Sequence, residues 1–164
     1  MGKSMRALFL LAGIMAVLII YNFMIKGSMV GVGKTETDGI APGEDLVITK
    51  NEITEIAKFY PYQFGNTKME IVAVKANDGT IRTALNTCQV CYDSGRGYYV
   101  QEGNELVCQN CRNRFQIEQV EKIKGGCNPV PILQENKTED DSNIVISGKF
   151  LASSAELFSN WHKE

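Results

Sequence analysis

The chain has 164 residues, with 17 basic and 19 acidic side chains, a formal net charge of −2 and a hydrophobic content of 44%. All the acidic residues, but only 14 of the basic ones, follow residue 26, so the larger part of the chain is acidic. That balance, without a basic stripe, argues against a nucleic-acid partner. The length allows one modest domain beside a short N-terminal segment.

The N-terminal segment has the features of a membrane anchor. The 19 positions from Ala7 to Ile25 contain no charged residue, and at ~1.5 Å per residue a helix of that length just spans a hydrocarbon core of ~30 Å. Lys3 and Arg6 precede this stretch, which predicts a cytoplasmic N-terminus. The alternative is a cleaved signal peptide, but the stretch is long for one and a small-residue cleavage site is poorly matched. We expect an uncleaved single-pass anchor within residues 1–26, in the cell membrane.

After the anchor, the composition predicts a tether and then one domain. Residues 27–43 are rich in glycine and polar side chains, as is typical of a flexible linker. Residues 44–164 are expected to form an extracytoplasmic domain with a single core. At its two ends, the capping boxes Thr49-x-x-Glu52 and Ser153-x-x-Glu156 predict short helices near residues 50–60 and 153–161, each after a short strand.

The middle of the domain has the pattern of a β structure. Two alternating runs, residues 70–75 and 80–85, flank an Asn-Asp-Gly turn and predict a hairpin. Residues 97–100 and 105–107 predict a second hairpin, and residues 114–117 a further short strand. We therefore predict a mainly β domain with two short helices, preceded by one N-terminal transmembrane helix.

Four cysteines at the ends of these hairpins form two C-x-x-C pairs, Cys88/Cys91 and Cys108/Cys111, with sixteen residues between the pairs. We call residues 88–91 the first knuckle and residues 108–111 the second knuckle. Two residues between thiols let both sulfurs of a pair turn toward one point, so two pairs can complete a cage of four sulfurs. Such cages select zinc, iron, iron–sulfur clusters or Cu(I). The alternatives are two disulfides or buried free thiols.

A fifth cysteine, Cys127, lies in the segment Gly-Gly-Cys-Asn-Pro-Val-Pro, residues 125–131, which we call the flap. The glycines permit positive φ or a close backbone approach, and the prolines stiffen the C-terminal half of the segment. We expect the flap to cover the site of the two knuckles, with the Cys127 sulfur beside it as a further cofactor-binding residue. The alternative is a tight loop carrying a small buried cysteine. Nearby aromatic residues are candidates to shield the sulfurs or to pack in the sheet: Tyr92, Tyr98, Tyr99 and Phe115.

The ordered set of two C-x-x-C pairs and Gly-Gly-Cys-Asn-Pro, together with Asp78-Gly79-Thr80-Ile81-Arg82 and Arg114-Phe115, resembles the FtrD-like family of membrane iron–sulfur proteins. The resemblance covers most of the domain. It implies redox-active cysteine ligands and an association with ferrous-iron uptake, with an iron permease or a redox protein at the membrane as partner.

The order of hairpin, ligand pair, hairpin, ligand pair and Gly/Pro flap is also similar, more distantly, to that of Rieske proteins. A Rieske ligand set needs histidines on one iron, and the only histidine of this chain, His162, lies in the C-terminal tail. An all-cysteine centre on a Rieske-like or small β-sandwich scaffold, with zinc-ribbon-like cysteine knuckles, remains open.

Three classes of function are compatible with these features. The first is a membrane-anchored, extracytoplasmic metal or iron–sulfur protein that transfers electrons or handles metal for ferrous-iron transport. The second is a zinc-stabilised binding module, and Cu is a further alternative metal. The third is a thiol–disulfide oxidoreductase, although a reactive C-x-x-C pair usually begins a helix and residues 92–95 have the composition of a turn. Whether the chain is an enzyme stays open, with metal binding or electron transfer favoured over catalysis; no hydrolase motif is present.

Overall fold

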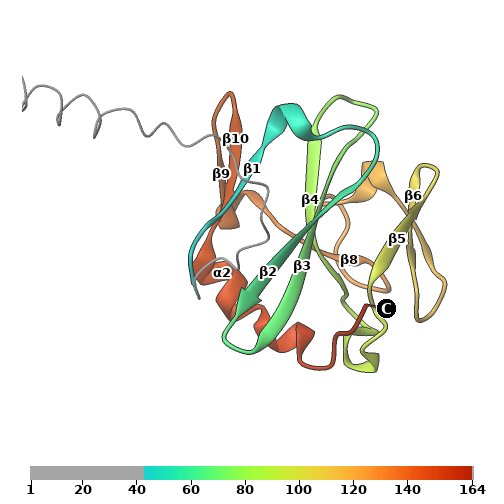
Figure 1. Cartoon of the computed structure of the whole chain (residues 1–164). Helices are drawn as coiled ribbons and strands as arrows, with labels where there is room; N and C mark the ends of the chain where they lie inside the picture. The colour runs from blue at the N-terminus through green and yellow to red at the C-terminus, as the bar shows by residue number, and fades with distance from the viewer. Residues whose placement is uncertain (1–42, 164) are drawn as a thin grey trace, which may run out of the picture. The chain divides into compact units, whose positions relative to one another are not determined.

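The computed structural model describes residues 43–163, which form a mainly β domain (Figure 1). The strands are β1 (Leu46–Thr49), β2 (Lys58–Phe64), β3 (Thr67–Lys75), β4 (Ile81–Cys88), β5 (Tyr99–Glu102), β6 (Glu105–Cys108), β7 (Arg114–Gln116), β8 (Pro129–Pro131), β9 (Lys137–Glu139) and β10 (Asn143–Ile146). The helical segments are α2 (Gly148–Ser153) and the short 3-10 turns Lys50–Glu52, Tyr92–Ser94, Ile117–Gln119, Gln134–Asn136 and Ala155–Phe158. The predicted mainly β class is confirmed.

The predicted anchor, residues 1–26, lies outside the described residues, as does the predicted tether except for Gly43. Among residues 43–163, no helix is both long enough and apolar enough to cross a membrane.

Three antiparallel sheets build the domain. The largest has the strand order β2-β3-β4-β8, and two three-stranded sheets have the orders β1-β10-β9 and β5-β6-β7. Both predicted hairpins are present, because β3 pairs with β4 and β5 pairs with β6. The predicted short strand after the second knuckle is β7, which pairs with β6. Figure 1 shows the sheet that contains β3 and β4 between the other two.

The four-stranded sheet is buried on both faces, which explains the uninterrupted apolar run in β3. Ile71 and Ala73 lie in one core, which includes residues of β1, β10 and α2. Val72 and Val74 lie in a second core, which includes Tyr99 and residues of β6 and β7. Because side chains alternate across a strand, neighbouring residues of β3 serve different cores. The described residues therefore have two cores, not the single core that we expected. The second core contains Cys88, Cys91 and Cys108.

The two short strands predicted at the ends of the domain pair with each other in one sheet. β1 pairs with β10 in antiparallel register, with Leu46 opposite Ile146 and Ile48 opposite Ile144. All four side chains are at most 5% exposed. The similar sequences of the two strands therefore reflect a shared environment, since both place alternate apolar residues into the same core.

The prediction of a helix near residues 50–60 is wrong. Only Lys50–Glu52 form a 3-10 turn, Thr49 makes no side-chain cap, and strand β2 begins at Lys58. The apolar spacing was misleading, because Ile53 is buried whereas Ile56 is 77% exposed. The aromatic run from residue 59 has strand propensity, and Pro61 is tolerated because β2 lies at the edge of its sheet.

The helix predicted near residues 153–161 begins earlier than expected. α2 covers Gly148–Ser153, and a 3-10 turn follows over Ala155–Phe158. The N-cap residues of the two segments are Ser147 and Ser154, and neither caps with its side chain. Ser153, the serine of the expected capping box, instead donates its hydroxyl to the Phe150 carbonyl at 2.8 Å. Leu151 and Phe158 carry the packing of this region, since both are buried in the first core.

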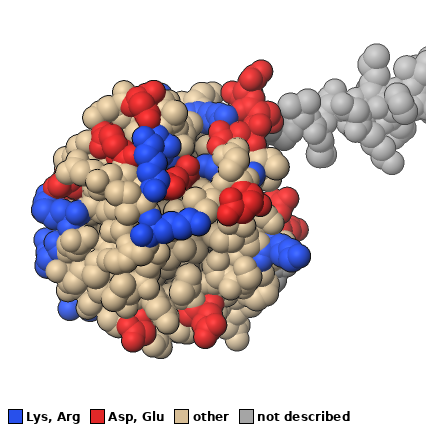
Figure 2. All heavy atoms as spheres, turned by 180° about the vertical axis from the view of Figure 1, so that it is seen from behind, with Lys and Arg blue, Asp and Glu red and all other residues tan. Residues whose placement is uncertain are grey.

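Charged side chains of both signs are mixed on the face shown in Figure 2, in keeping with the near balance of the composition. Several charged side chains of residues 43–163 form ion pairs. Arg114 of β7, for example, pairs with Glu105 at 2.5 Å and with Glu102 at 2.7 Å. These exposed pairs contribute little to stability individually.

Candidate metal centre

The five cysteines come from three separate parts of the chain. Cys88 ends β4 and Cys108 ends β6, so each knuckle begins where a strand stops. β4 has an irregular register with β8 between Leu85 and Cys88, and such an irregularity re-aims the chain next to a site. Cys127 lies just before β8, whose first residue, Pro129, is the register partner of Cys88. The sheet thus brings the flap to the first knuckle.

The structure brings all five sulfurs together. The Sγ atoms of Cys88, Cys91 and Cys108 lie within 4.8 Å of one another, and those of Cys91, Cys111 and Cys127 do so as well. Cys91 belongs to both groups, and its sulfur is 3.8 Å from that of Cys127. All five are free thiols. The two knuckles and Cys127 therefore lie together, but Cys111 groups with Cys91 and Cys127 rather than with Cys88 and Cys108.

Backbone amides face the sulfurs in the same way in both knuckles. The N–H of Cys91 donates to the Cys88 sulfur at 3.4 Å, and the N–H of Val90 lies against the same sulfur. In the second knuckle the amides of Asn110 and Cys111 face the Cys108 sulfur. Such N–H donors stabilise a thiolate and orient it toward a metal.

Close contact between the thiols gives them different pKa values. Contact with the neighbouring Cys108 thiol lowers the pKa of Cys88 to about 4. The same contact, together with burial, raises the pKa of Cys108. Burial likewise raises the pKa of Cys91. The neighbouring Cys111 sulfur, and then burial, raise the pKa of Cys127 to about 12. Adjacent buried thiols cannot all ionise without a cation, which a metal ion would supply.

Tyr99 lies under the site and connects its parts. Its side chain is fully buried, it is the register partner of Cys108, and its hydroxyl donates to the carbonyl of Cys127 at 2.9 Å. The hydroxyl also lies against the Cys88 sulfur, where it helps to lower the pKa of that thiol. Burial raises the pKa of Tyr99 itself, so the hydroxyl keeps its proton. Among the predicted shielding aromatics, Phe115 is also buried in this core.

The flap is fixed by hydrogen bonds on both sides of Cys127. The Gln89 side chain, inside the first knuckle, accepts from the Gly125 N–H at 2.9 Å and donates to the Pro129 carbonyl at 3.1 Å. Asn113, just after the second knuckle, donates to the Cys127 carbonyl at 2.8 Å. Gly125 and its neighbour Gly126 both have the predicted positive φ. Gln89 and Asn113 could not be singled out from the sequence, because amide side chains on loops are common.

The C-terminal segment supports the first knuckle from outside. His162 donates its backbone N–H to the Gly95 carbonyl at 3.0 Å, and the Trp161 indole donates to the Asn86 carbonyl at 2.9 Å. Trp161 also packs edge-on against Tyr98, with ring centroids 6.3 Å apart. Asn86 is fully buried and accepts from the Tyr99 N–H at 2.7 Å. Segments distant in sequence therefore converge on the strand end that carries Cys88.

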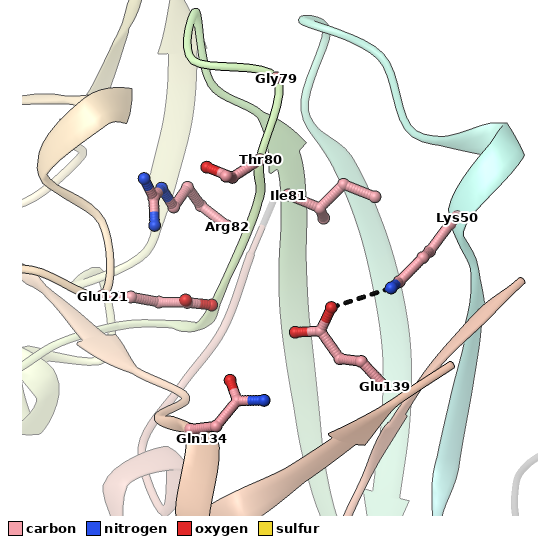
Figure 3. Close-up of a pocket in the computed structure, with 8 residues that line it drawn as sticks. All are labelled: Lys50, Gly79, Thr80, Ile81, Arg82, Glu121, Gln134 and Glu139. Atoms are coloured by element: carbon pink, nitrogen blue, oxygen red, sulfur yellow. Dashed lines mark ion pairs between the residues drawn. The ribbon is translucent and has the colours of Figure 1, made fainter. Parts of the chain in front are cut away.

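A pocket of about 370 Å³ lies elsewhere, between β4 and the segment around β9 (Figure 3). Lys50 and Glu139 form an ion pair there at 3.0 Å, and Glu121 accepts from the buried Lys137 ammonium at 2.7 Å. Arg82, which also lines the pocket, pairs with Asp78 at 2.7 Å. Its lining is Lys50, Gly79, Thr80, Ile81, Arg82, Glu121, Gln134 and Glu139, without a cysteine. We assign it no part in the thiol site.

Comparison with known families matches residues 48–158 to the family described as "Membrane iron-sulfur containing protein FtrD-like". The matched segment covers more than half of the chain and contains all five cysteines. A search of curated proteins finds no match.

Proposed function

This chain belongs to the FtrD-like family of membrane iron–sulfur proteins, and on that premise we propose that it holds an iron–sulfur cluster, or a single iron, through Cys88, Cys91, Cys108 and Cys111. In this proposal the centre transfers electrons, or handles iron, at the membrane in support of ferrous-iron transport. The partner is an iron permease or a redox protein of the same membrane.

The observation that carries the proposal is the set of five converging free thiols with amide N–H donors aimed at Cys88 and Cys108. The donor set fits iron: thiolates bind iron and its clusters, and hydrogen bonds to sulfur tune the reduction potential. When bound, the cluster supplies a one-electron redox couple. The chain supplies the ligands, the N–H donors and a largely buried, low-dielectric setting. The order of knuckles and flap supports a Rieske-like variant of the small β-sandwich, with cysteines in place of histidines.

An electron-transfer centre also needs one place where little protein separates it from the surface at which a redox partner docks. Cys88 and Cys108 are fully buried, whereas Cys111 is exposed. Val90, in the first knuckle, is 56% exposed although it is apolar. An exposed sulfur on one knuckle and an exposed apolar side chain on the other support a docking edge at the thiol cluster. In our proposal the predicted anchor, residues 1–26, keeps this domain on the extracytoplasmic side of the membrane.

Redox spectroscopy tests this function. Full-length protein, purified in detergent without oxygen, should absorb visible light, lose the absorption on addition of dithionite and regain it on mild reoxidation. The variant Cys108→Ser should lose this absorption. A colourless protein that retains zinc would instead support the alternative of a zinc-stabilised module, and a copper signal would identify Cu as the metal.

Thiol–disulfide exchange is the third function that the sequence allows. The residues after Cys91 form only the three-residue turn Tyr92–Ser94, which offers little helix dipole to activate a thiol. The same purified protein decides this case: catalysis of disulfide reduction by a colourless, metal-free protein would contradict an iron–sulfur function.

A further inference from the structure

The five sulfurs are arranged in two layers that differ in exposure. Cys88 and Cys108 are fully buried and Cys91 is 8% exposed, so these three form an inner triad. Cys127 is half-buried and Cys111 is exposed, and with Cys91 they form an outer triad. Each triad is close enough within itself to bind one ion, and Cys91 is the sulfur that the two have in common.

The number of thiols exceeds what one ion uses. A tetrahedral ion with metal–sulfur bonds of ~2.3 Å takes four sulfurs, which then lie ~3.8 Å apart. The Cys91 and Cys127 sulfurs are already 3.8 Å apart, the separation of two ligands of one ion. A single ion among Cys88, Cys91, Cys108 and Cys111 would leave the Cys127 thiol against bound thiolates without a partner of its own.

Side-chain hydrogen bonds fix the position of Cys127. Three side chains from different parts of the domain hold the flap: Tyr99 and Asn113 donate to the Cys127 carbonyl, and Gln89 binds the backbone at Gly125 and Pro129. Because Gln89 and Asn113 adjoin the two knuckles, the flap is tied to both pairs of ligands. Preorganisation of this kind is what a metal site requires.

We propose that Cys91, Cys111 and Cys127 form a second metal position, at the solvent edge, which shares Cys91 and Cys111 with the four-cysteine centre. It takes a thiophilic ion with three thiolate ligands and leaves one coordination position open to solvent or to a partner's ligand. The inference rests on the proposed function only in that both use the same thiol cluster. It extends that function from one centre to two adjoining positions of unequal exposure.

Metal stoichiometry tests the inference without reference to activity. Full-length protein in detergent, stripped of metal under reducing, oxygen-free conditions, is titrated with Cd²⁺ and followed by thiolate absorption and native mass spectrometry. We expect two ions per chain in the wild type and one in Cys127→Ser. One ion in both proteins, or two in both, would overturn the inference. Failure to bind any ion would contradict the proposed function itself.

A second variant protects the test against misfolding of Cys127→Ser. Gln89→Ala keeps all five thiols and removes the two hydrogen bonds that the Gln89 side chain makes to the flap. We expect it to bind the first ion as the wild type does and the second at least ~10-fold more weakly, since a preorganised ligand is lost. Unchanged affinity for both ions would overturn the inference, and thermal unfolding of each metal-free variant establishes that the domain is folded.

Discussion

Tyr99 shows how one residue can serve both the core and the site. Its ring fills the second core, while its hydroxyl reaches the Cys127 carbonyl and the Cys88 sulfur. A buried aromatic residue with a polar end usually finds a hydrogen-bond partner, and here the partners belong to a knuckle and to the flap. Tyr99 is therefore a positioning residue for the thiol cluster.

Removing only this hydroxyl should separate packing from positioning. We expect Tyr99→Phe to lower the free energy of unfolding by about 1–2 kcal/mol, because a buried hydrogen bond to the Cys127 carbonyl is lost. We also expect it to shift the midpoint potential of the loaded centre. The measurements are urea denaturation and a redox titration.

The adjacent variant Tyr98→Phe provides the control, since the Tyr98 ring packs against Trp161 at the periphery. It should leave the potential unchanged. Equal potentials for the wild type and Tyr99→Phe would show that Tyr99 only fills space.

At the scale of secondary-structure elements, the C-terminal segment acts as a brace for the first knuckle. Gly95 has φ +76°, and a Cβ there would collide with the Asn160 carbonyl oxygen and the His162 ring. Gly103, in the β5–β6 turn, has a similar φ of +64° and open space around it. The two glycines thus share a backbone conformation but differ in their surroundings.

This difference makes Gly95→Ala and Gly103→Ala a matched pair. Both variants should lose about 1 kcal/mol of stability from the left-handed backbone. Gly95→Ala should lose more and should release bound metal faster, because its methyl group displaces the C-terminal segment. Chemical denaturation and metal transfer to a chelator measure the two effects. Equal losses in the two variants would mean that the segment does not brace the knuckle.

The turn of the β3–β4 hairpin depends on one carboxylate. The Thr80 hydroxyl, followed by the Thr80 amide, lowers the pKa of Asp78 below its ordinary value of 3.8, and Arg82 pairs with it at 2.7 Å. A depressed pKa stabilises the fold above the unfolded-state value and loses that effect as the pH falls through the folded-state value. Asp78→Asn should therefore destabilise the protein near neutral pH.

The difference between wild type and Asp78→Asn should narrow as the pH falls below 3.8, because protonation removes the charge from the wild type as well. Urea denaturation over a series of pH values measures it. A difference independent of pH would indicate that shape, not charge, sets the contribution of this turn.

The sequence predicted elements well where local signals and tertiary structure agree. The β3–β4 and β5–β6 hairpins have alternating strands and glycine-containing turns, and both are present. The helix near residues 50–60 failed because pairing with β3 overrides a local capping box. β8 was not predicted, because its two prolines argue against a strand, although prolines are tolerated in a strand at the edge of a sheet. β9, with only three residues, has too little sequence for a periodic signal.

At the scale of the whole molecule, three sheets create two cores, and the thiol cluster belongs to one of them. The candidate ligand residues could be proposed from the sequence, because C-x-x-C spacing is a local property. The division into inner and outer triads could not be predicted from the sequence. It depends on how deeply the ends of β4 and β6 are buried in the second core. The roles of Gln89 and Asn113 also required the structure, because their partners lie on a distant flap.

The central claim is that this cluster of thiols holds iron. The most direct measurement is the content of iron, acid-labile sulfide and zinc per chain in full-length protein purified from membranes without oxygen. We predict iron bound together with sulfide, or iron alone for a mononuclear centre, and loss of that iron in Cys88→Ser and Cys108→Ser. A protein that contains zinc without iron, or iron that persists when both Cys88 and Cys108 are replaced, would contradict the account.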